Sequence, residues 1–151
     1  MDLEKLDAEL KRDEGERLTA YRDTLGNLTI GYGHLILDSD HIPEGSTISE
    51  ARSIELYIHD RDHAIVAVSM LFGDVATYPE LIQRVLVNLM FNLGPNRLAK
   101  FKNFVAAIKN HDYIVAGNEL ENSLAYEQEP QRFDRLIAMC DTCADDAEAV
   151  V

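Results

Sequence analysis

Most of the chain has the apolar spacing of amphipathic helices. Leu3, Leu6 and Leu10 recur at intervals of three and four residues, which predicts a helix over the first dozen residues. A longer pattern follows the stretch TISE at 47–50, which matches a capping box, and it continues to Gly73. We expect this long helix to link two lobes.

The second half of the chain is predicted to be helical throughout. A strongly apolar helix is expected to begin at Pro79, which suits a first helical turn, and to be stopped by Gly94-Pro95. Further helices are predicted over 98–108, 112–123 and 130–143. Asp112 is a natural N-cap for the middle one of these three.

The segment from Arg17 to about Ile36 loses the helical period. Glycines at 26, 31 and 33 interrupt it, and the turn LGN separates the β-prone pieces TAYRD and LTIGY. This pattern predicts a small hairpin or a three-stranded sheet, and the polar stretch over 38–46 is then a loop. The fold class is therefore α+β, with one small sheet near the N-terminus and helices elsewhere.

The charge balance narrows the function classes. There are 27 acidic and 14 basic residues, and the resulting net charge of -13 argues against binding to nucleic acid or to anionic membrane surfaces. No apolar run approaches the roughly 20 residues of a membrane-spanning helix, so no membrane insertion is expected. The first residues lack the apolar core of a signal peptide, so we expect none.

Cys140 and Cys143 form an isolated CxxC at the end of an apolar helical run. Without a second cysteine pair or a histidine pair nearby, this spacing is a weak indication of zinc. We expect one cysteine in the core and the other exposed, with neither a metal nor a chemical role.

The stretch DEGERLTAYRDTLGNLTIGYGH, residues 13–34, carries the best-spaced catalytic groups. Glu14 is expected at the end of the first helix, Asp23 at the hairpin turn and Thr29 in the returning strand. Two carboxylates in different environments can cleave a glycosidic bond when one donates a proton and the other stays ionised, and a hydroxyl can hold the water. Ordinary turn chemistry is the alternative interpretation, because Asp often caps turns.

The same stretch closely resembles the signature region of the phage-type lysozymes, the family of the T-even phage muramidase. That family combines an acidic pair before Gly, an aromatic before a basic residue and Asp, a Thr-x-Gly turn and TIGxGH, and all of these stand here. NLMFNLG at 88–94, LAKFKNF at 98–104 and YEQEPQR at 126–132 also resemble family segments, so the similarity touches most of the chain. Ala125 and Glu129 replace the family's usual Trp and Thr.

The resemblance implies a single lysozyme-like domain over 1–151. A sheet-containing lobe is expected over 13–60, and the long helix would join it to a helical lobe. That helical lobe would comprise 1–12 and 61–143, followed by an acidic tail over 144–151.

The resemblance also implies the roles of individual residues. Glu14 would be the general acid, Asp23 the carboxylate on the other side of the sugar, and Thr29 the group that positions the attacking water for inversion. The implied supporting residues are Asp13, His34, Asp60, Arg132 and Arg135; His34 would pair with Asp60, Arg135 with Asp13, and Arg132 would lie against Glu14. The implied sugar contacts are Leu35, Phe91, Asn92, Tyr126 and Gln128.

The implied activity is that of a muramidase that cleaves the β-1,4 bond between N-acetylmuramic acid and N-acetylglucosamine, without a metal or an organic cofactor. Its partner would be bacterial peptidoglycan, and a monomer is expected. The implied setting is a phage endolysin, made in the host cytoplasm and released to the wall and periplasm at lysis. Two alternatives stay open: a lytic transglycosylase, and a non-catalytic wall-binding or decoy protein on the same fold.

Overall fold

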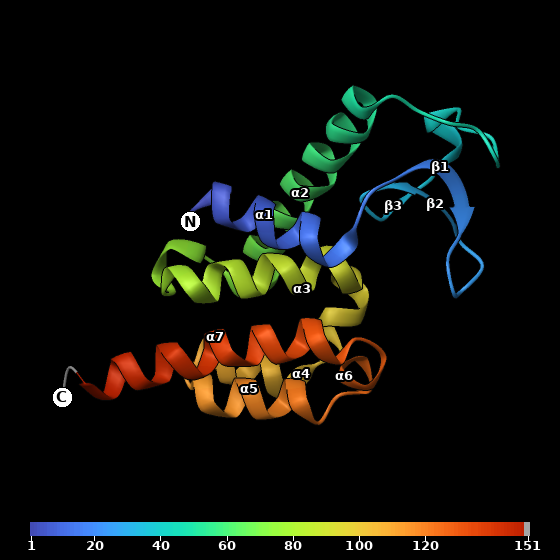
Figure 1. Cartoon of the computed structure of the whole chain (residues 1–151). Coiled ribbons are helices and arrows are strands. Elements are labelled where there is room, and N and C mark those ends of the chain that lie inside the picture. The colour runs from blue at the N-terminus through green and yellow to red at the C-terminus, as the bar shows by residue number, and fades with distance from the viewer. Residues whose placement is uncertain (150–151) are drawn as a thin grey trace. The chain divides into compact units, whose positions relative to one another are not determined.

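The computed structural model describes residues 1–149, which form two compact units (Figure 1). The sheet unit comprises Glu4–His63. The helical unit comprises Met1–Leu3 and the described chain from Ala64 onward. Residues 4–12, which the sequence analysis grouped with the helical lobe, thus belong to the sheet unit. They do so because Asp7 accepts hydrogen bonds from Tyr57 and Arg61 of the long helix.

The sheet unit contains the whole of the predicted sheet. Its elements are α1 (Leu3–Glu14), β1 (Arg17–Arg22), β2 (Leu28–Gly31), β3 (His34–Leu35), the 3-10 turn η1 (Asp38–Asp40) and the first part of α2 (Glu50–Phe72). The strands are antiparallel in the order β1-β2-β3, which confirms the three-stranded version of the prediction. The stretch over 38–46 is a loop apart from the single turn of η1.

One face of the sheet is apolar and forms a small core. Ala20, Ile30 and Leu56 are buried there, and four partly buried residues pack against them: Leu28, Ile36, Ile42 and Ile48. Because side chains alternate along a strand, the neighbouring positions of β1, β2 and β3 lie on the opposite face. That second face carries the candidate catalytic positions described below.

The start of α2 differs from the prediction. The helix begins at Glu50, and the hydroxyl of Ser49 accepts a hydrogen bond from the N–H of Arg52, so Ser49 rather than Thr47 is the N-cap. Thr47 instead forms an isolated β-bridge to Thr19, and the two hydroxyls are 2.9 Å apart. The predicted capping box is therefore wrong by two residues, because a contact with β1 holds Thr47 in extended backbone.

The helical unit follows the predicted periodicity, except that the helix predicted over 98–108 is interrupted at Lys100 and Phe101. Its elements are the 3-10 turn η2 (Val75–Thr77), α3 (Glu80–Ala99), α4 (Lys102–Lys109), α5 (Tyr113–Glu121), α6 (Leu124–Gln128) and α7 (Pro130–Ala149). Asp112 caps α5 as predicted, since its carboxylate accepts from the N–H of Val115. In Figure 1, α7 lies along α5, and α3 and α6 also pack on it. The short helix α6, capped by Ser123, was not predicted.

Two helix ends predicted in this unit need correction. Gly94 does interrupt α3, with φ 76° and ψ 165°, but the helical turns resume at Pro95, the favoured first position of a helix, and run to Ala99. The acidic end is not a frayed tail up to residue 149, because α7 continues to Ala149. Residues 150 and 151 of the predicted tail lie outside the described residues.

Both cysteines are buried, which corrects the expectation that one would be exposed. Cys140 and Cys143 carry free thiols one helical turn apart on the buried side of α7. Burial raises the pKa of the Cys140 thiol to about 12, so it stays protonated and packs as a small apolar group. No helix within 1–149 is long and apolar enough to cross a membrane.

Candidate active site

Glu14 ends α1 and lies against the turn that joins β2 to β3. The helix stops there because Gly15 takes a left-handed φ of +66° while its N–H still bonds to the carbonyl of Lys11. A Cβ on Gly33 would stand 2.6 Å from Oε2 of Glu14, and Gly33 itself has φ +69°. The carboxyl of Glu14 therefore occupies the space that any side chain at position 33 would need.

Asp23 closes the turn between β1 and β2. Its Oδ1 accepts hydrogen bonds from the N–H groups of Leu25 and Asn27, at 2.9 and 2.8 Å. Asp23 therefore does cap this turn, and it does so through Oδ1. Within residues 1–149, the hydrogen-bond contact of Oδ2 is a long one, 3.5 Å from the amide nitrogen of Asn27, so Oδ2 remains able to bind a further donor.

Thr29 lies in the middle of the sheet, in a row of side chains on the face opposite the core. Its Cα is paired across the strands with Tyr21 on one side and with Leu35 on the other. Directly opposite residues point to the same face of an antiparallel sheet, so Tyr21, Thr29 and Leu35 form one row. Thr29 is buried, and its hydroxyl donates to the carbonyl of Asn27 at 3.0 Å, which leaves its oxygen as an acceptor.

Tyr21 is influenced by the charges of both candidate carboxylates. Burial raises the pKa of its phenol, the positive charge of Arg17 lowers it, and the negative charges of Glu14 and Asp23 raise it again. The phenol is therefore within electrostatic reach of both acids. The guanidinium of Arg17 stacks over the Tyr21 ring, 3.8 Å from its centroid. Tyr21 entered the sequence analysis only as part of a motif, because its pairing with Thr29 appears only once the strands are in register.

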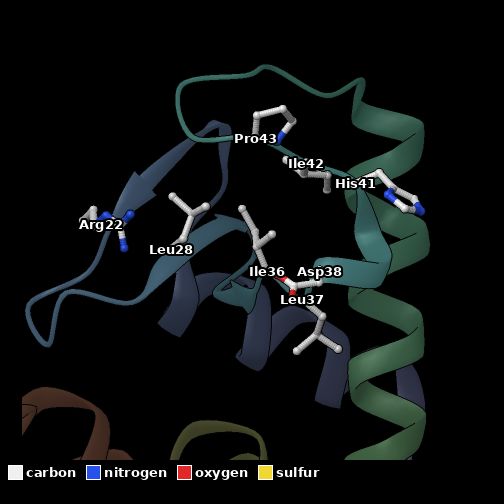
Figure 2. Close-up of a pocket in the computed structure, with 8 residues that line it drawn as sticks. All are labelled: Arg22, Leu28, Ile36, Leu37, Asp38, His41, Ile42 and Pro43. Carbon is white, nitrogen blue, oxygen red and sulfur yellow. The ribbon is translucent and has the colours of Figure 1, made fainter.

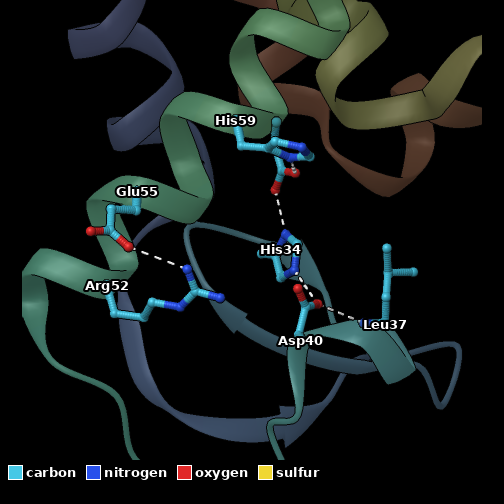
Figure 3. A network of polar contacts seen from close by, with 7 residues as sticks. His34, Leu37, Asp40, Arg52, Glu55 and His59 are labelled. Carbon is cyan, nitrogen blue, oxygen red and sulfur yellow. Dashed lines mark hydrogen bonds and ion pairs between the residues drawn. The ribbon is translucent and has the colours of Figure 1, made fainter.

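The supporting pair predicted for this unit is present and has a third member. Nδ1 of His34 is 2.6 Å from Oδ2 of Asp60 on α2, and Nε2 is 2.8 Å from Oδ2 of Asp40 in η1 (Figure 3). Burial opposes a charged imidazole, but the hydrogen bonds and charges of the two carboxylates outweigh it, so the pKa of His34 is raised. The contact between His34 and Asp40 depends on the path of the loop that carries Asp40, and no local sequence pattern predicted it. Asp13 bonds to the adjacent Arg12, at 3.2 Å.

In the helical unit, Arg132 is buried and anchored to α3. Its Nε donates to the side-chain carbonyl of Asn88 at 2.8 Å, and its guanidinium is 3.8 Å from Glu129. The other carboxylate oxygen of Glu129 accepts from the amide of Asn92 at 2.9 Å. The side-chain carbonyl of Asn92 is buried and has no hydrogen-bond partner within residues 1–149. Glu129, which departs from the family pattern, therefore binds the amide nitrogen of Asn92, while the amide oxygen of Asn92 can still accept a hydrogen bond.

The other predicted residues of the helical unit lie on α3, α6 and α7. The hydroxyl of Tyr126 donates to Asp134, and Gln128, the last residue of α6, is exposed. Phe91 and Arg135 are partly buried on α3 and α7. In the sheet unit, Thr29 lies between Tyr21 and Leu35 in one row, and the charges of Glu14 and Asp23 both reach the phenol of Tyr21.

A hollow of about 550 Å³ lies elsewhere in the sheet unit (Figure 2). Leu28, Ile36 and Ile42 line it, so it opens on the apolar face of the sheet and not on the face of Thr29. It is therefore not the candidate active site. Among the described residues, no group of three His, Cys, Asp or Glu side chains could hold a metal ion.

Comparisons with known proteins identify the family of this chain. Residues 11–131 match the family model of the phage lysozymes. The chain is similar to a probable T4-type lysozyme of Dictyostelium discoideum, with 31% identity over 88% of this chain and 91% of the relative. It is also similar to an endolysin of Salmonella phage P22, with 36% identity over 65% of this chain and 72% of the relative. A peptidoglycan hydrolase of Pseudomonas phage phiKMV matches with 27% identity over 85% of this chain, which corresponds to 14% of that longer protein. The chain belongs to the phage lysozyme family.

Proposed function

We propose that the chain is a muramidase that hydrolyses the β-1,4 bond between N-acetylmuramic acid and N-acetylglucosamine in peptidoglycan, with inversion. Family membership makes it a glycoside hydrolase of the lysozyme type. The observation that supports the finer proposal most is the shared face of the sheet unit. There Thr29 lies directly opposite Tyr21 across the strands, and the phenol of Tyr21 feels the charges of both Asp23 and Glu14.

Glu14 is the general acid in this proposal. It must hold a proton at working pH and pass it to the oxygen of the leaving sugar. Its place at a helix end against Gly33 fixes the carboxyl where an added Cβ could not fit. The absence of a side chain at position 33 thereby leaves room for the carboxyl of the proton donor.

Asp23 and Thr29 prepare the attacking water. Oδ1 of Asp23 is held by two N–H groups of its turn, which fixes the carboxylate and leaves Oδ2 to accept a proton from water. Because the Thr29 hydroxyl gives its own proton to the Asn27 carbonyl, its oxygen can accept the second hydrogen of that water. A water held at both hydrogens directs its lone pairs outward to the sugar. An inverting enzyme needs this water between carboxyls roughly 6.5–9.5 Å apart.

Sugar binding is assigned to Leu35, Phe91, Asn92, Tyr126 and Gln128. Leu35 offers an exposed apolar surface in the same row as Thr29. The unfilled carbonyl of Asn92 can accept a hydrogen bond from an acetamido N–H. The Glu129→Ala variant, which frees the Asn92 amide, is expected to raise KM more than it lowers kcat.

The setting that fits this activity is host lysis. The P22 relative is named an endolysin, which supports this setting. In our proposal the protein is a monomer that stays in the host cytoplasm until it reaches the wall.

The stereochemistry of the product tests the proposed mechanism. Proton NMR of a soluble peptidoglycan fragment during the first minutes of reaction should show the α anomer at the new reducing end before mutarotation. Early β anomer would contradict inversion. A 1,6-anhydro end, lighter by one water in mass analysis, would instead identify a lytic transglycosylase.

A further inference from the structure

Arg17 differs from the other arginines of the sheet unit in having no carboxylate partner within residues 1–149. It is exposed at the start of β1, and its recorded contact is the stacking on Tyr21. The remaining arginines of this unit form ion pairs: Arg12 with Asp13, Arg22 with Glu44, Arg52 with Glu55, and Arg61 with Asp7 and Asp62. In a chain with 27 acids and 14 bases, an arginine that lacks such a partner is conspicuous.

The position of Arg17 places its charge at the proposed active site. Its guanidinium lies on the ring of Tyr21, which is paired with Thr29 across the strands. A guanidinium stacked flat on an aromatic ring keeps its N–H edge free, and that edge matches the two oxygens of a carboxylate. Stacking also holds the side chain in one orientation, which lowers the entropy lost when a ligand binds.

We propose that Arg17, held on the ring of Tyr21, binds a carboxylate carried by the peptide branch of the peptidoglycan strand. This inference rests on the proposed function, because it names a contact within that same site. A net charge of -13 repels a strand that itself carries carboxylates. One cation beside the reacting groups supplies local attraction and fixes where along the strand the enzyme binds.

Binding to insoluble peptidoglycan tests the contact without turnover. The Glu14→Gln protein is incubated with peptidoglycan freed of attached anionic polymers, and the bound fraction is measured by sedimentation. One sample of the wall material is left native, and in the other the carboxyls are converted to neutral amides. Adding Arg17→Gln should weaken binding to native material about fivefold, the upper range for an exposed ion pair, and leave binding to amidated material unchanged.

Arg52→Gln is the matched control, because it removes the same charge from the same unit and loses only an exposed pair with Glu55. It should weaken binding to native material far less than Arg17→Gln does. Equal losses from the two variants, or an equal loss on native and amidated material, would overturn the proposal. Unchanged binding of the Arg17→Gln protein to native material would overturn it as well.

The role of the ring is tested by two further variants. Tyr21→Phe keeps the stacking surface and should retain binding, whereas Tyr21→Leu should weaken it about as much as Arg17→Gln. Combining Tyr21→Leu with Arg17→Gln should add little, because both remove one interaction. Full additivity would show that the two residues act separately. Melting temperatures of all variants, measured alongside, separate lost binding from lost folding.

Hydrolysis of the native material by the unmutated protein is measured in parallel. If that protein releases no reducing ends, the proposed function fails. If it does so and Arg17→Gln binds normally, only the carboxylate contact fails.

Discussion

At the scale of the residue, Gly33 meets two independent requirements. Its φ of +69° is strained for any residue with a Cβ, and the Cβ would stand 2.6 Å from the Glu14 carboxyl. Gly45 has a similar φ of +79° but no atom within 4 Å of its Cβ position. The two glycines therefore separate the cost of backbone strain from the cost of displacing Glu14, the proposed general acid.

Gly33→Ala and Gly45→Ala should each lower the free energy of unfolding by about 1–2 kcal/mol, as measured by urea denaturation. Only Gly33→Ala should also lower kcat on peptidoglycan, by at least about tenfold, since a displacement of the acid disturbs proton transfer. Equal kcat values for the two variants would show that the contact between Gly33 and Glu14 has no catalytic consequence.

At the scale of the element, the sequence predicted the strands and turns whose conformation depends on neighbouring residues. The glycines of TIGYGH and the LGN turn predicted a hairpin or a three-stranded sheet, because left-handed turns and alternation are properties of neighbouring residues. The cap of α2 was misplaced because Thr47 and Ser49 are both good caps, and a long-range bridge to Thr19 decides between them. The partners Asp40 of His34 and Asn88 of Arg132 were missed for the same reason: they come from the path of the folded chain.

The cap assignment has a direct test. Ser49→Ala should lower the free energy of unfolding by about 1 kcal/mol, because it leaves the N–H of Arg52 without its acceptor. Thr47→Ala should cost less, since it loses only an exposed hydroxyl contact. Urea denaturation of both variants measures the difference, and the opposite ranking would restore Thr47 as the cap.

The buried His34 joins β3, η1 and α2 through two carboxylates, so its protonation should control the stability of the sheet unit. The pKa of His34 is raised, so its contribution is fully present below its ordinary value of 6.5 and is lost as the pH rises through the raised value. Burial alone would raise the pKa of Asp40, but the hydrogen bonds from His34 and from the N–H of Leu37 outweigh this effect, so the pKa of Asp40 is lowered. The contribution of Asp40 is therefore present above its ordinary value of 3.8 and is lost as the pH falls through the lowered value.

Between pH 3.8 and 6.5, His34→Gln should lower the free energy of unfolding by about 3 kcal/mol. Above this range the difference from the unmutated protein should shrink as the native imidazole loses its proton. Urea denaturation at a series of pH values measures this, and a difference that stays constant to pH 10 would contradict a charged His34.

At the scale of the whole molecule, the net charge of -13 opposes approach to an anionic cell wall. Added salt weakens long-range repulsion, because the screening length falls to about 10 Å at 0.1 M. The rate of clearing of a wall suspension should therefore rise as salt increases from near zero to about 0.1 M. A rate that falls steadily from the lowest salt upward would show that attraction, not repulsion, dominates the encounter.

The central claim is that Glu14 supplies the proton that breaks the glycosidic bond. The most direct measurement compares Glu14→Gln with the unmutated protein for release of reducing ends from purified peptidoglycan, with circular dichroism to monitor the fold. Gln has nearly the same shape and no proton to give, so we predict a loss of at least about 10²-fold in kcat with an unchanged spectrum and melting temperature. Activity within a few-fold of the unmutated protein would contradict the assignment of Glu14 as the acid.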